Sequence, residues 1–317
     1  MHPAYSVIFF TVSSGAGFGM LMIAGTLAAI GRLSTDALFG WLVMAAALGA
    51  AAAGLISSTL HLGHPERAWR ALGQWRTSWL SREGVAAVAT FPPALLFAWG
   101  WAVAGKLSFP YVCAGGIAAV LALVTVACTG MIYQSLVTIR AWHNRLVTPV
   151  YLVLALASGA LWLAFLARVT GNGDPALTHL PIGLLAAGWL LKRRYWRGRD
   201  NDTGGPTVAS ATGLGRDGDS VRLLESPHTQ ENFVMREMGY RIARKHALKL
   251  RRVAVALAFA LPMALTGAAM LPAAAPIAAV LALLAAVGGT IGIAAERWLF
   301  FAEARHAVTL YYGAERA

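Results

Sequence analysis

Long stretches without a charged residue alternate with short polar segments along the chain. Seven stretches contain no Asp, Glu, Lys or Arg, and each is near or above the roughly 20 apolar residues that cross a bilayer core: Pro3–Gly31, Ala37–Leu60, Gly84–Gly105, Leu107–Ile139, Leu146–Ala167, Pro175–Leu191 and Val253–Ala295. The last stretch is long enough for two helices, joined at a proline-flanked turn over 272–276. The pattern therefore predicts an all-α integral membrane protein, a bundle of eight transmembrane helices.

The positions of Lys and Arg predict the orientation of these helices. With eight spans, both termini lie on the same side of the membrane as the segments after the second, fourth and sixth spans. Those segments and the C-terminal tail carry every Lys and Arg except Arg32, Lys106 and Arg168. Because cytoplasmic segments are enriched in Lys and Arg, we expect both the N-terminus and the C-terminus in the cytoplasm. The expected location is the bacterial inner (cytoplasmic) membrane.

The chain divides into three parts. Residues 1–191 hold spans one to six, residues 192–252 form a cytoplasmic segment, and residues 253–317 hold the last two spans and a tail. The cytoplasmic segment starts with a polar composition that is typical of flexible chain. From Glu231 to Arg252 it has the pattern of a basic amphipathic helix. Such a helix can bind anionic lipid headgroups or dock a cytoplasmic partner, and the two roles are compatible.

Composition and cysteine content narrow the possible chemistry. Charged residues make up 13% of the 317 positions, about half the share in a soluble domain, so the net charge of +12 reflects membrane orientation and not nucleic-acid binding. The two cysteines, Cys113 and Cys128, are too few for the four thiolates of an iron–sulfur cluster. The histidines fall in loops or at the ends of the runs, which argues against a transmembrane haem, and none has zinc-finger spacing. We expect no metal and no redox centre in this chain.

The densest group of polar and aromatic residues follows the second charge-free run. In this predicted hairpin, residues 61–83, three Trp and several Arg lie between a histidine and a glutamate. An interfacial aromatic belt with anchoring arginines explains the Trp and Arg, but it does not require His61 and Glu83. We expect His61 to close the second helix and Ser81 to cap the third, with Glu83 in its first turn. His61 and Glu83 then lie at the same membrane depth.

A quinone headgroup would suit this hairpin. It needs apolar walls, a hydrogen-bond partner for each carbonyl, and a titratable group that exchanges its protons, a task that suits histidine. A purely structural anchor is the main rival that the residues allow. A solute transporter is disfavoured, because no run carries an ionisable residue near its middle and the two halves show no repeat with interrupted helices.

Several motifs in combination resemble the membrane anchor subunits of the dimethyl sulfoxide reductase type. They are the start His2-Pro-Ala-Tyr-Ser-Val-Ile-Phe-Phe-Thr11, then His61-Leu-Gly63 with Pro65, Arg67 and Ala68, and then Ser81-Arg-Glu83. The expected eight-helix layout agrees, so the resemblance covers nearly the whole chain. The motifs are moderately specific together, and no single one would suffice.

The resemblance implies a three-subunit complex whose other subunits lie on the cytoplasmic side. One partner, with a molybdenum bis-guanine-dinucleotide cofactor, performs the substrate chemistry, and a second partner with four iron–sulfur (4Fe–4S) clusters carries the electrons. The anchor exchanges these electrons with a quinone, either ubiquinone or menaquinone. The chain would thus be the subunit of an oxidoreductase that carries only the quinone half-reaction.

The resemblance also assigns roles to individual residues. The family's quinol-linked histidine and glutamate correspond to His61 and Glu83, and its following arginine to Arg67, whereas His64 stands where the family has a small residue and inherits no role. We expect His61 to hydrogen-bond a quinone carbonyl and Glu83 to relay protons to or from cytoplasmic water. Arg67 and Arg70 would stabilise negative charge or contact the partner. Weaker candidates for the same pocket, at the end of the fourth span, are Tyr133, Arg140 and His143.

The cytoplasmic segment favours one branch of this family. Pro227-His-Thr, Asn232-Phe, Arg236-Glu-Met-Gly-Tyr and Arg244-Lys-His resemble the anchor of the cytoplasm-facing sulfite dehydrogenase complex, which oxidises sulfite to sulfate and passes two electrons to quinone. The alternative is the anchor of a dimethyl sulfoxide reductase, which oxidises quinol and has the opposite orientation. The residues expected to dock the partner subunits are Arg76, Phe233, Arg236, Arg244 and Lys245.

Overall fold

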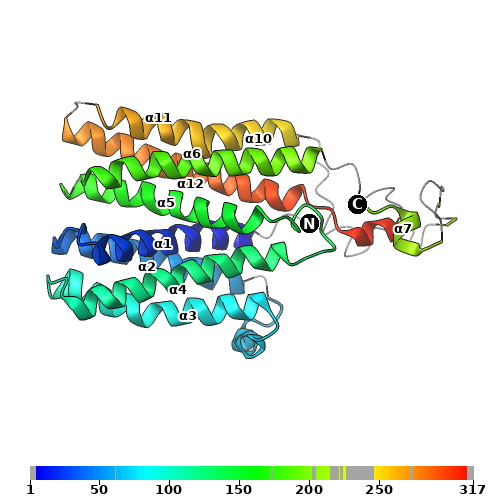
Figure 1. Cartoon of the computed structure of the whole chain (residues 1–317), viewed down its shortest axis with the longest axis horizontal. Helices are drawn as coiled ribbons and strands as arrows, with labels where there is room; N and C mark the ends of the chain where they lie inside the picture. Colours follow the sequence, from blue (N-terminus) through cyan, green and yellow to red (C-terminus); the bar gives the residue numbers. More distant parts are fainter. Residues whose placement is uncertain are drawn as a thin grey trace.

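The regular elements of the described chain are all helices. The computed structural model describes residues 5–60, 62–172, 174–201, 205–214, 221, 224–225, 246–271 and 274–312. Within these residues, eight long helical rods run side by side in alternating directions (Figure 1). The rods are α1 (Tyr5–Ala29), α2 (Ala37–Thr59), α3 (Trp79–Ala98) continued by η2 (Trp99–Val103), α4 (Phe109–Gln134), α5 (Val147–Val169), α6 (Pro175–Asp200), α10 (Ala247–Val255) continued by η3 (Ala256–Ala260) and α11 (Leu261–Ala268), and α12 (Ala275–Ala302). The short helices are η1 (Pro65–Gln74), α7 (Val208–Thr212) and η4 (Ala307–Tyr312).

Six of the rods are long and apolar enough to cross a membrane, counting only the described residues. These candidate spans are Tyr5–Ala29, Ala37–Thr59, Trp79–Val103, Phe109–Gln134, Val147–Val169 and Ala275–Tyr311. The α6 rod and the α10–α11 rod are not among them. The prediction of an all-α protein is therefore confirmed, whereas eight membrane spans remain a prediction.

Both ends of the described chain lie at one end of the bundle. The start of α1 and the helix η4 are found there together with η1 and α7 (Figure 1). The last residues of α1, η2, α5 and α11 lie at the opposite end (Figure 1). We call the end of the bundle that holds the start of α1, η1 and η4 the hairpin end. The structure thus places the first and last described helices at the same end of the bundle as η1, and the cytoplasmic location of both termini remains a prediction.

The third helix starts earlier than the charge-free run suggests. α3 begins at Trp79, and Ser78 caps it by accepting a hydrogen bond from the backbone N–H of Ser81 at 3.4 Å. The expectation that Ser81 is the cap and that Glu83 lies in the first turn is wrong. The Ser81 hydroxyl instead donates to the Ala71 carbonyl and joins the helix to η1.

Other helix ends also depart from the charge-free runs. α6 continues to Asp200 and α12 to Ala302, well beyond the charged residues at which the runs end. Those charged residues are paired inside the bundle and therefore need not reach water. α4, in contrast, ends at Gln134 and not at the predicted Ile139. The part of the predicted amphipathic helix that the structure describes is helical from Ala247 and runs on through η3 into α11.

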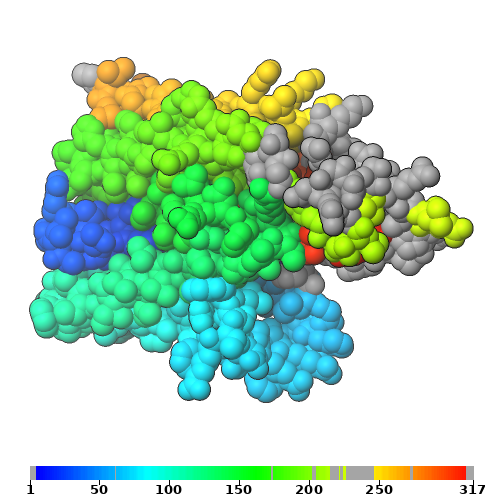
Figure 2. Space-filling model, turned by 45° about the vertical axis from the view of Figure 1, so that its right-hand side comes forward, coloured from blue at the N-terminus to red at the C-terminus, as the bar shows by residue number. Residues whose placement is uncertain are grey.

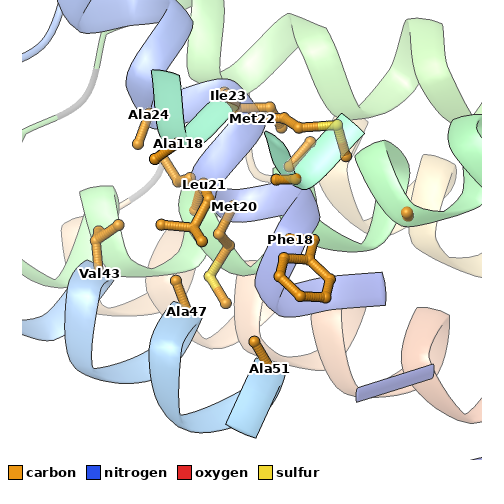
Figure 3. Packing of buried hydrophobic residues seen from close by; sticks show 14 of the residues in the cluster. Phe18, Met20, Leu21, Met22, Ile23, Ala24, Val43, Ala47, Ala51 and Ala118 are labelled. Carbon is orange, nitrogen blue, oxygen red and sulfur yellow. The ribbon is translucent and has the colours of Figure 1, made fainter. Parts of the chain in front are cut away.

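α1 is the central helix of one half of the bundle and packs on α2, α4 and α5. Small residues allow this packing: a Cβ atom on Gly19 would collide with the Ala155 carbonyl of α5, and one on Gly25 with the Gly115 carbonyl of α4. Such contacts bring helix backbones together where apolar burial alone cannot favour association. Figure 3 shows the side chains around this helix, Phe18, Met20, Leu21, Met22, Ile23 and Ala24 of α1, Val43, Ala47 and Ala51 of α2, and Ala118 of α4.

Candidate functional site

Glu83 is a buried carboxyl near the hairpin end of α3. Its exposed fraction is 4%, and its Oε1 atom accepts a short hydrogen bond from the Thr129 hydroxyl of α4. That hydroxyl also lies 3.1 Å from the Thr125 carbonyl oxygen, so it has two possible acceptors for one proton. Among the described residues, this hydroxyl is the one hydrogen-bond partner of the buried carboxyl.

An aromatic cluster lies one helical turn further along α4. The ring centroid of Tyr133 is 5.6 Å from that of Tyr151, with the rings stacked, and 5.2 Å from that of Trp142. Phe300 and Phe301 of α12 each lie 5.4 Å from Tyr133. These five residues from α4, α5, α12 and the loop after α4 form apolar walls next to Thr129, and the phenol groups add hydrogen-bonding capacity.

Three charged residues are buried between α6 and α12. Lys192 is 2% exposed and forms an ion pair with Glu296, which is fully buried. Arg297, also 2% exposed, places Nη1 3.3 Å from Oε2 of Glu296 and its guanidinium carbon 3.5 Å from the ring centroid of Tyr151. Buried charges are tolerated when they are paired. Lys192, Glu296 and Arg297 form what we call the buried charge group.

Sequence reasoning missed the buried charge group. It treated Lys192 and Glu296 as the points at which apolar runs reach water, and so it found no ionisable residue inside a span. One signal was present: a lysine directly follows one apolar run, and an acid–base pair, Glu296 and Arg297, directly follows another. Without knowing that α6 and α12 bring these residues together, the sequence cannot separate an internal pair from two helix ends.

The described residues of the hairpin before α3 are largely exposed. η1 has no buried residue, and both Arg67 and Arg70 are exposed. The Nε atom of Arg67 is 3.7 Å from Glu66, and the guanidinium of Arg70 lies 5.5 Å from the Trp69 ring centroid. In Figure 2 the hairpin stands out from the body of the bundle beside the start of α3. His61, the other predicted catalytic residue, lies outside the described residues.

Arg82 connects the hairpin to α3. Its Nε atom donates to the Trp75 carbonyl at 2.9 Å and Nη2 to the Arg76 carbonyl at 2.6 Å. The guanidinium carbon lies 4.3 Å from the Trp79 ring centroid, a cation–π distance. No role for Arg82 could be assigned from the sequence. Because Arg82 directly precedes Glu83, its bonds hold the hairpin next to the buried carboxyl.

Arg140 and His143 lie in the exposed loop after α4. His143 Nδ1 is 2.8 Å from the Gln134 carbonyl oxygen. Arg140 lines a polar cavity of about 380 Å³ at the hairpin end, where the ends of α6, α10 and α12 meet. Arg251 bonds Glu303 there at 2.8 Å and Asp200 at 2.7 Å. The structure thus brings Glu83 and Tyr133 to one helix interface, and places Arg140 beside a different, polar cavity.

The predicted docking residues fall mostly outside the described chain. Arg76 is exposed, with its guanidinium 5.4 Å from the Trp75 ring centroid. Phe233, Arg236, Arg244 and Lys245 lie outside the described residues. Within the ranges that the structure describes, no group of three or more His, Cys, Asp or Glu side chains could hold a metal ion.

The fold and the comparisons together define the class of this protein as a multi-pass membrane anchor subunit. Its helices include six of membrane-spanning length and hydropathy among the described residues. The model of the family described as DMSO reductase anchor subunit (DmsC) matches residues 1–313, and the chain belongs to this family.

Two relatives locate the chain within the family. It is 34% identical to the C subunit of the sulfite dehydrogenase of Allochromatium vinosum over 98% of this chain and 99% of the relative. It is 28% identical to the anaerobic dimethyl sulfoxide reductase chain YnfH of Escherichia coli K12 over 59% of this chain and 66% of that relative. The predicted family, and the likeness to a sulfite dehydrogenase anchor, are confirmed.

Proposed function

We propose that this chain is the membrane anchor and quinone-binding subunit of a heterotrimeric molybdenum and iron–sulfur oxidoreductase of the bacterial inner membrane. The complex oxidises sulfite to sulfate and delivers the electrons to quinone. The observation that carries the proposal is the carboxyl of Glu83, buried at the hairpin end of α3 and hydrogen-bonded to Thr129. Among the described residues Glu83 has no ion-pair partner, and a carboxyl buried in this way is costly to keep ionised. Such groups are found preferentially at functional sites, including those of proton exchange.

The donor set around Glu83 fits a quinone in its chemistry. The aromatic cluster offers flat apolar walls, Thr129 and the tyrosines offer hydroxyl groups, and Glu83 offers a group that binds and releases a proton. A bound quinone would supply reversible two-electron, two-proton redox chemistry. The cavity that Thr129 lines has a volume of only about 10 Å³, too small for a ring. The ring would therefore bind outside this cavity, on the hairpin side of Glu83.

Each residue then has a distinct task. His61 hydrogen-bonds a quinone carbonyl and exchanges a proton with it. Glu83 holds the second exchangeable proton and passes it to or from cytoplasmic water, with the Thr129 hydroxyl fixing the orientation of the carboxyl. Arg67 and Arg70 contribute positive charge at the exposed hairpin, where they stabilise negative charge or contact the iron–sulfur partner.

The substrate assignment is supported by two independent features. The likeness to the sulfite dehydrogenase anchor extends over 98% of this chain, against 59% for the dimethyl sulfoxide reductase chain. The charge distribution predicts a cytoplasmic hairpin end, on the side where a cytoplasm-facing complex binds. The alternative, the anchor of a reductase that oxidises quinol, would require the opposite orientation.

The proposal includes eight spans with both termini in the cytoplasm. α6 and the α10–α11 rod run beside the six candidate spans for a comparable length (Figure 1), which supports their crossing the membrane with them. Reporter fusions test this topology: alkaline phosphatase should be active when fused after Arg32, Lys106 or Arg168, and inactive when fused within 62–78 or after Tyr312. Active phosphatase at the hairpin would overturn the proposed orientation.

The site is tested by single substitutions in the assembled complex. We expect His61→Ala and Glu83→Gln each to lower sulfite-dependent quinone reduction by about 100-fold, since proton transfer by a positioned group contributes roughly that factor. The control is His64→Ala in the same exposed loop, whose Nδ1 atom is 3.0 Å from Glu66; it should retain wild-type turnover. Sulfite oxidation with a soluble electron acceptor should be unchanged in all three variants.

The result also separates the rival functions. A purely structural anchor would assemble the complex, and its quinone-linked turnover would be insensitive to His61→Ala and Glu83→Gln. A solute transporter would move solute in vesicles and copurify with neither iron nor molybdenum. Gentle detergent extraction, metal analysis and identification of the copurifying chains decide between these outcomes and reveal the partner subunits.

A further inference from the structure

A small polar cavity lies inside the bundle between α1, α4, α5 and α12. Its volume is about 10 Å³, and every residue that lines it is buried. The polar side chains in its wall are Thr11, Ser14, Thr129, Tyr151, Ser158 and Arg297. A space of this size holds about one water molecule, which stays if it finds two to four polar partners.

Within the described residues, two side chains in the wall have donors without a hydrogen-bond partner, the Ser158 hydroxyl and Nε of Arg297. The Tyr151 hydroxyl faces only that of Tyr133. The hydroxyl protons of Thr11 and Ser14 are already given to carbonyl oxygens of their own helix, at 3.0 and 2.6 Å. An unmet buried donor costs about 1–3 kcal/mol. A water oxygen would accept from two of these donors at once, which makes an empty cavity the less stable state.

Thr129 connects this cavity to Glu83. Its hydroxyl proton can go to Glu83 or to the Thr125 carbonyl, while its oxygen still accepts one bond from the cavity side. When Thr129 donates to an ionised Glu83, all hydrogen bonds can point one way, from Arg297 to water, from water to Thr129, and from Thr129 to the carboxylate. When Glu83 holds a proton, it can donate to Thr129, and Thr129 then donates to Thr125.

The charges of the interior support the same connection. The buried charged residues in the part of the chain that the structure describes are Glu83, Lys192, Glu296 and Arg297. Lys192 and Glu296 form one ion pair. Arg297 is also 3.3 Å from Glu296, so Lys192, Glu296 and Arg297 together carry one net positive charge, and Glu83 carries one negative charge when it is ionised. Arg297 lines the cavity itself, and Glu83 is hydrogen-bonded to Thr129 in its wall. An internal pair of opposite charges, joined through a water molecule and a hydroxyl, is less costly than two isolated charges.

We propose that this cavity holds one ordered water that links Arg297 and Tyr151 to Thr129, and that Arg297 acts through this water as a positioning residue that stabilises the ionised form of Glu83. The use of this link in catalysis rests on the proposed role of Glu83 in quinone chemistry, whereas the link itself does not. When Glu83 takes up a proton, the Thr129 hydroxyl changes its acceptor from the carboxylate to the Thr125 carbonyl, whereas Arg297 donates to the water in both states.

Other titratable groups also surround Glu83 and must be separated from Arg297. Of the described residues, Arg82 precedes it on α3, and Cys128 and Tyr133 on α4 and Tyr151 on α5 interact with it electrostatically. None of the substitutions proposed below removes Arg82, Cys128 or Tyr133. A change in the protonation of Glu83 then comes from Arg297, Thr129 or Ser158 and not from these groups, and Ser158→Val separates the water from the charge of Arg297 and from the direct Thr129 hydrogen bond.

Infrared spectroscopy of the full chain in lipid nanodiscs tests the proposal. The C=O band of protonated Glu83 is identified as the band that Glu83→Gln removes. Arg297→Met should raise the ratio of protonated to ionised Glu83 at neutral pH by about tenfold, the factor that corresponds to one lost hydrogen-bonded interaction with a charged group. Arg297→Lys should show a smaller rise, because it retains the positive charge.

Two further variants keep the test valid if Arg297→Met does not fold. Ser158→Val fills the cavity, and Thr129→Val cuts the link, without removing a buried charge. Each should raise the protonated ratio, and Ser158→Val should abolish a water O–H band that shifts in H₂¹⁸O. The matched control is Thr125→Val, one turn away on α4 and equally buried, whose hydroxyl bonds the Leu121 carbonyl of its own helix at 2.8 Å. It should leave both bands unchanged.

The outcomes separate this inference from the proposed function. Thr129→Val also removes the direct hydrogen bond to Glu83, so Ser158→Val is the decisive variant. If Ser158→Val leaves the protonated ratio within twofold of wild type, and no water band responds, Arg297 only packs against Tyr151 and the inference is wrong. If the ratio changes as expected while Glu83→Gln retains full quinone turnover, the water link stands and the quinone role of Glu83 fails.

Discussion

The hairpin and the buried charge group contain similar residues in opposite surroundings. In the hairpin, the guanidinium of Arg70 lies over Trp69 and remains exposed. Between α6 and α12, Nζ of Lys192 lies 4.3 Å from the Tyr195 ring centroid and is 2% exposed, with Glu296 as its ion-pair partner. A basic residue beside an aromatic ring therefore does not by itself mark the membrane surface. A basic residue inside the bundle needs a carboxylate partner, as Lys192 has in Glu296, whereas an exposed one such as Arg70 does not.

The two regions should also differ in their energetic importance. An exposed charge in the hairpin loses little when its neighbour is removed, because water replaces the contact. A charge inside the bundle has no such replacement, so removing its partner exposes the full desolvation cost. Substitutions that compare the two regions therefore test whether the burial inferred for α6 and α12 exists in the folded protein.

The largest effect is expected from Lys192→Met. This substitution leaves Glu296 with only Arg297 beside it, and we expect the free energy of unfolding in detergent micelles to fall by about 3–5 kcal/mol. The double variant Lys192→Met with Glu296→Gln should recover only part of the loss, because it removes the carboxylate that has lost Lys192 but also the acid beside the buried Arg297. Arg70→Met, the hairpin control, should change stability by no more than about 0.5 kcal/mol. Equal effects at Lys192 and Arg70 would show that the ion pair is not internal.

The next largest effect concerns packing without charge. Gly19→Ala places a methyl group against the Ala155 carbonyl and should cost about 1–3 kcal/mol of stability, the usual cost of overpacking. Gly49→Ala on α2 is the matched control, because a Cβ atom there meets nothing within 4 Å. It should be neutral or slightly stabilising, since Ala favours a helix over Gly. Thermal unfolding of both variants measures the difference.

A smaller effect is expected where the hairpin joins the bundle. Arg82→Ala removes the hydrogen bonds to the Trp75 and Arg76 carbonyls and should cost about 1 kcal/mol. The loss should be local, so hydrogen exchange should become about fivefold faster in the hairpin amides and stay unchanged in α1. Arg67→Ala, which removes no such bond, serves as the control. Unchanged exchange in Arg82→Ala would mean that the hairpin is held by other contacts.

The smallest effect is expected at the ends of α6, α10 and α12. Arg251 bonds Glu303 and Asp200 there, and Asp200 is about half exposed. Arg251→Ala should therefore lower stability by only about 0.5–1 kcal/mol. Because salt screens exposed charges, the difference from wild type should shrink in high salt. A difference that is constant from low to high salt would indicate a buried network like that of Lys192.

The helices could be predicted from the sequence better than their ends. Charge-free runs located all the long rods, including the turn between α11 and α12, because a bilayer-length apolar run has few alternative structures. The predicted ends of α3, α4, α6 and α12 were wrong, because a helix does not end where its charge-free run ends. The side chain of Ser78, and not that of Ser81, caps α3. The length of an apolar run does not determine which of two nearby serines is the cap.

The candidate site was partly predictable. Glu83 was singled out because a carboxyl at that position has no role in an aromatic belt, and the structure places it in a buried contact with Thr129. Thr129, Tyr151 and Arg297 were not singled out. They come from α4, α5 and α12, and nothing in the sequence of one helix reveals which residues of another it will face.

By itself, the sequence determined that this protein is a helical membrane anchor, which segments form its rods, and which hairpin concentrates its polar residues. These properties follow from the cost of exposing polar backbone and charge to lipid, which acts on each segment separately. Only the tertiary structure decided which charges are internal, which helices meet at Glu83, and where a water-sized polar cavity is enclosed. Those properties depend on pairs of side chains far apart in the chain, whose energies exist only once the helices have packed.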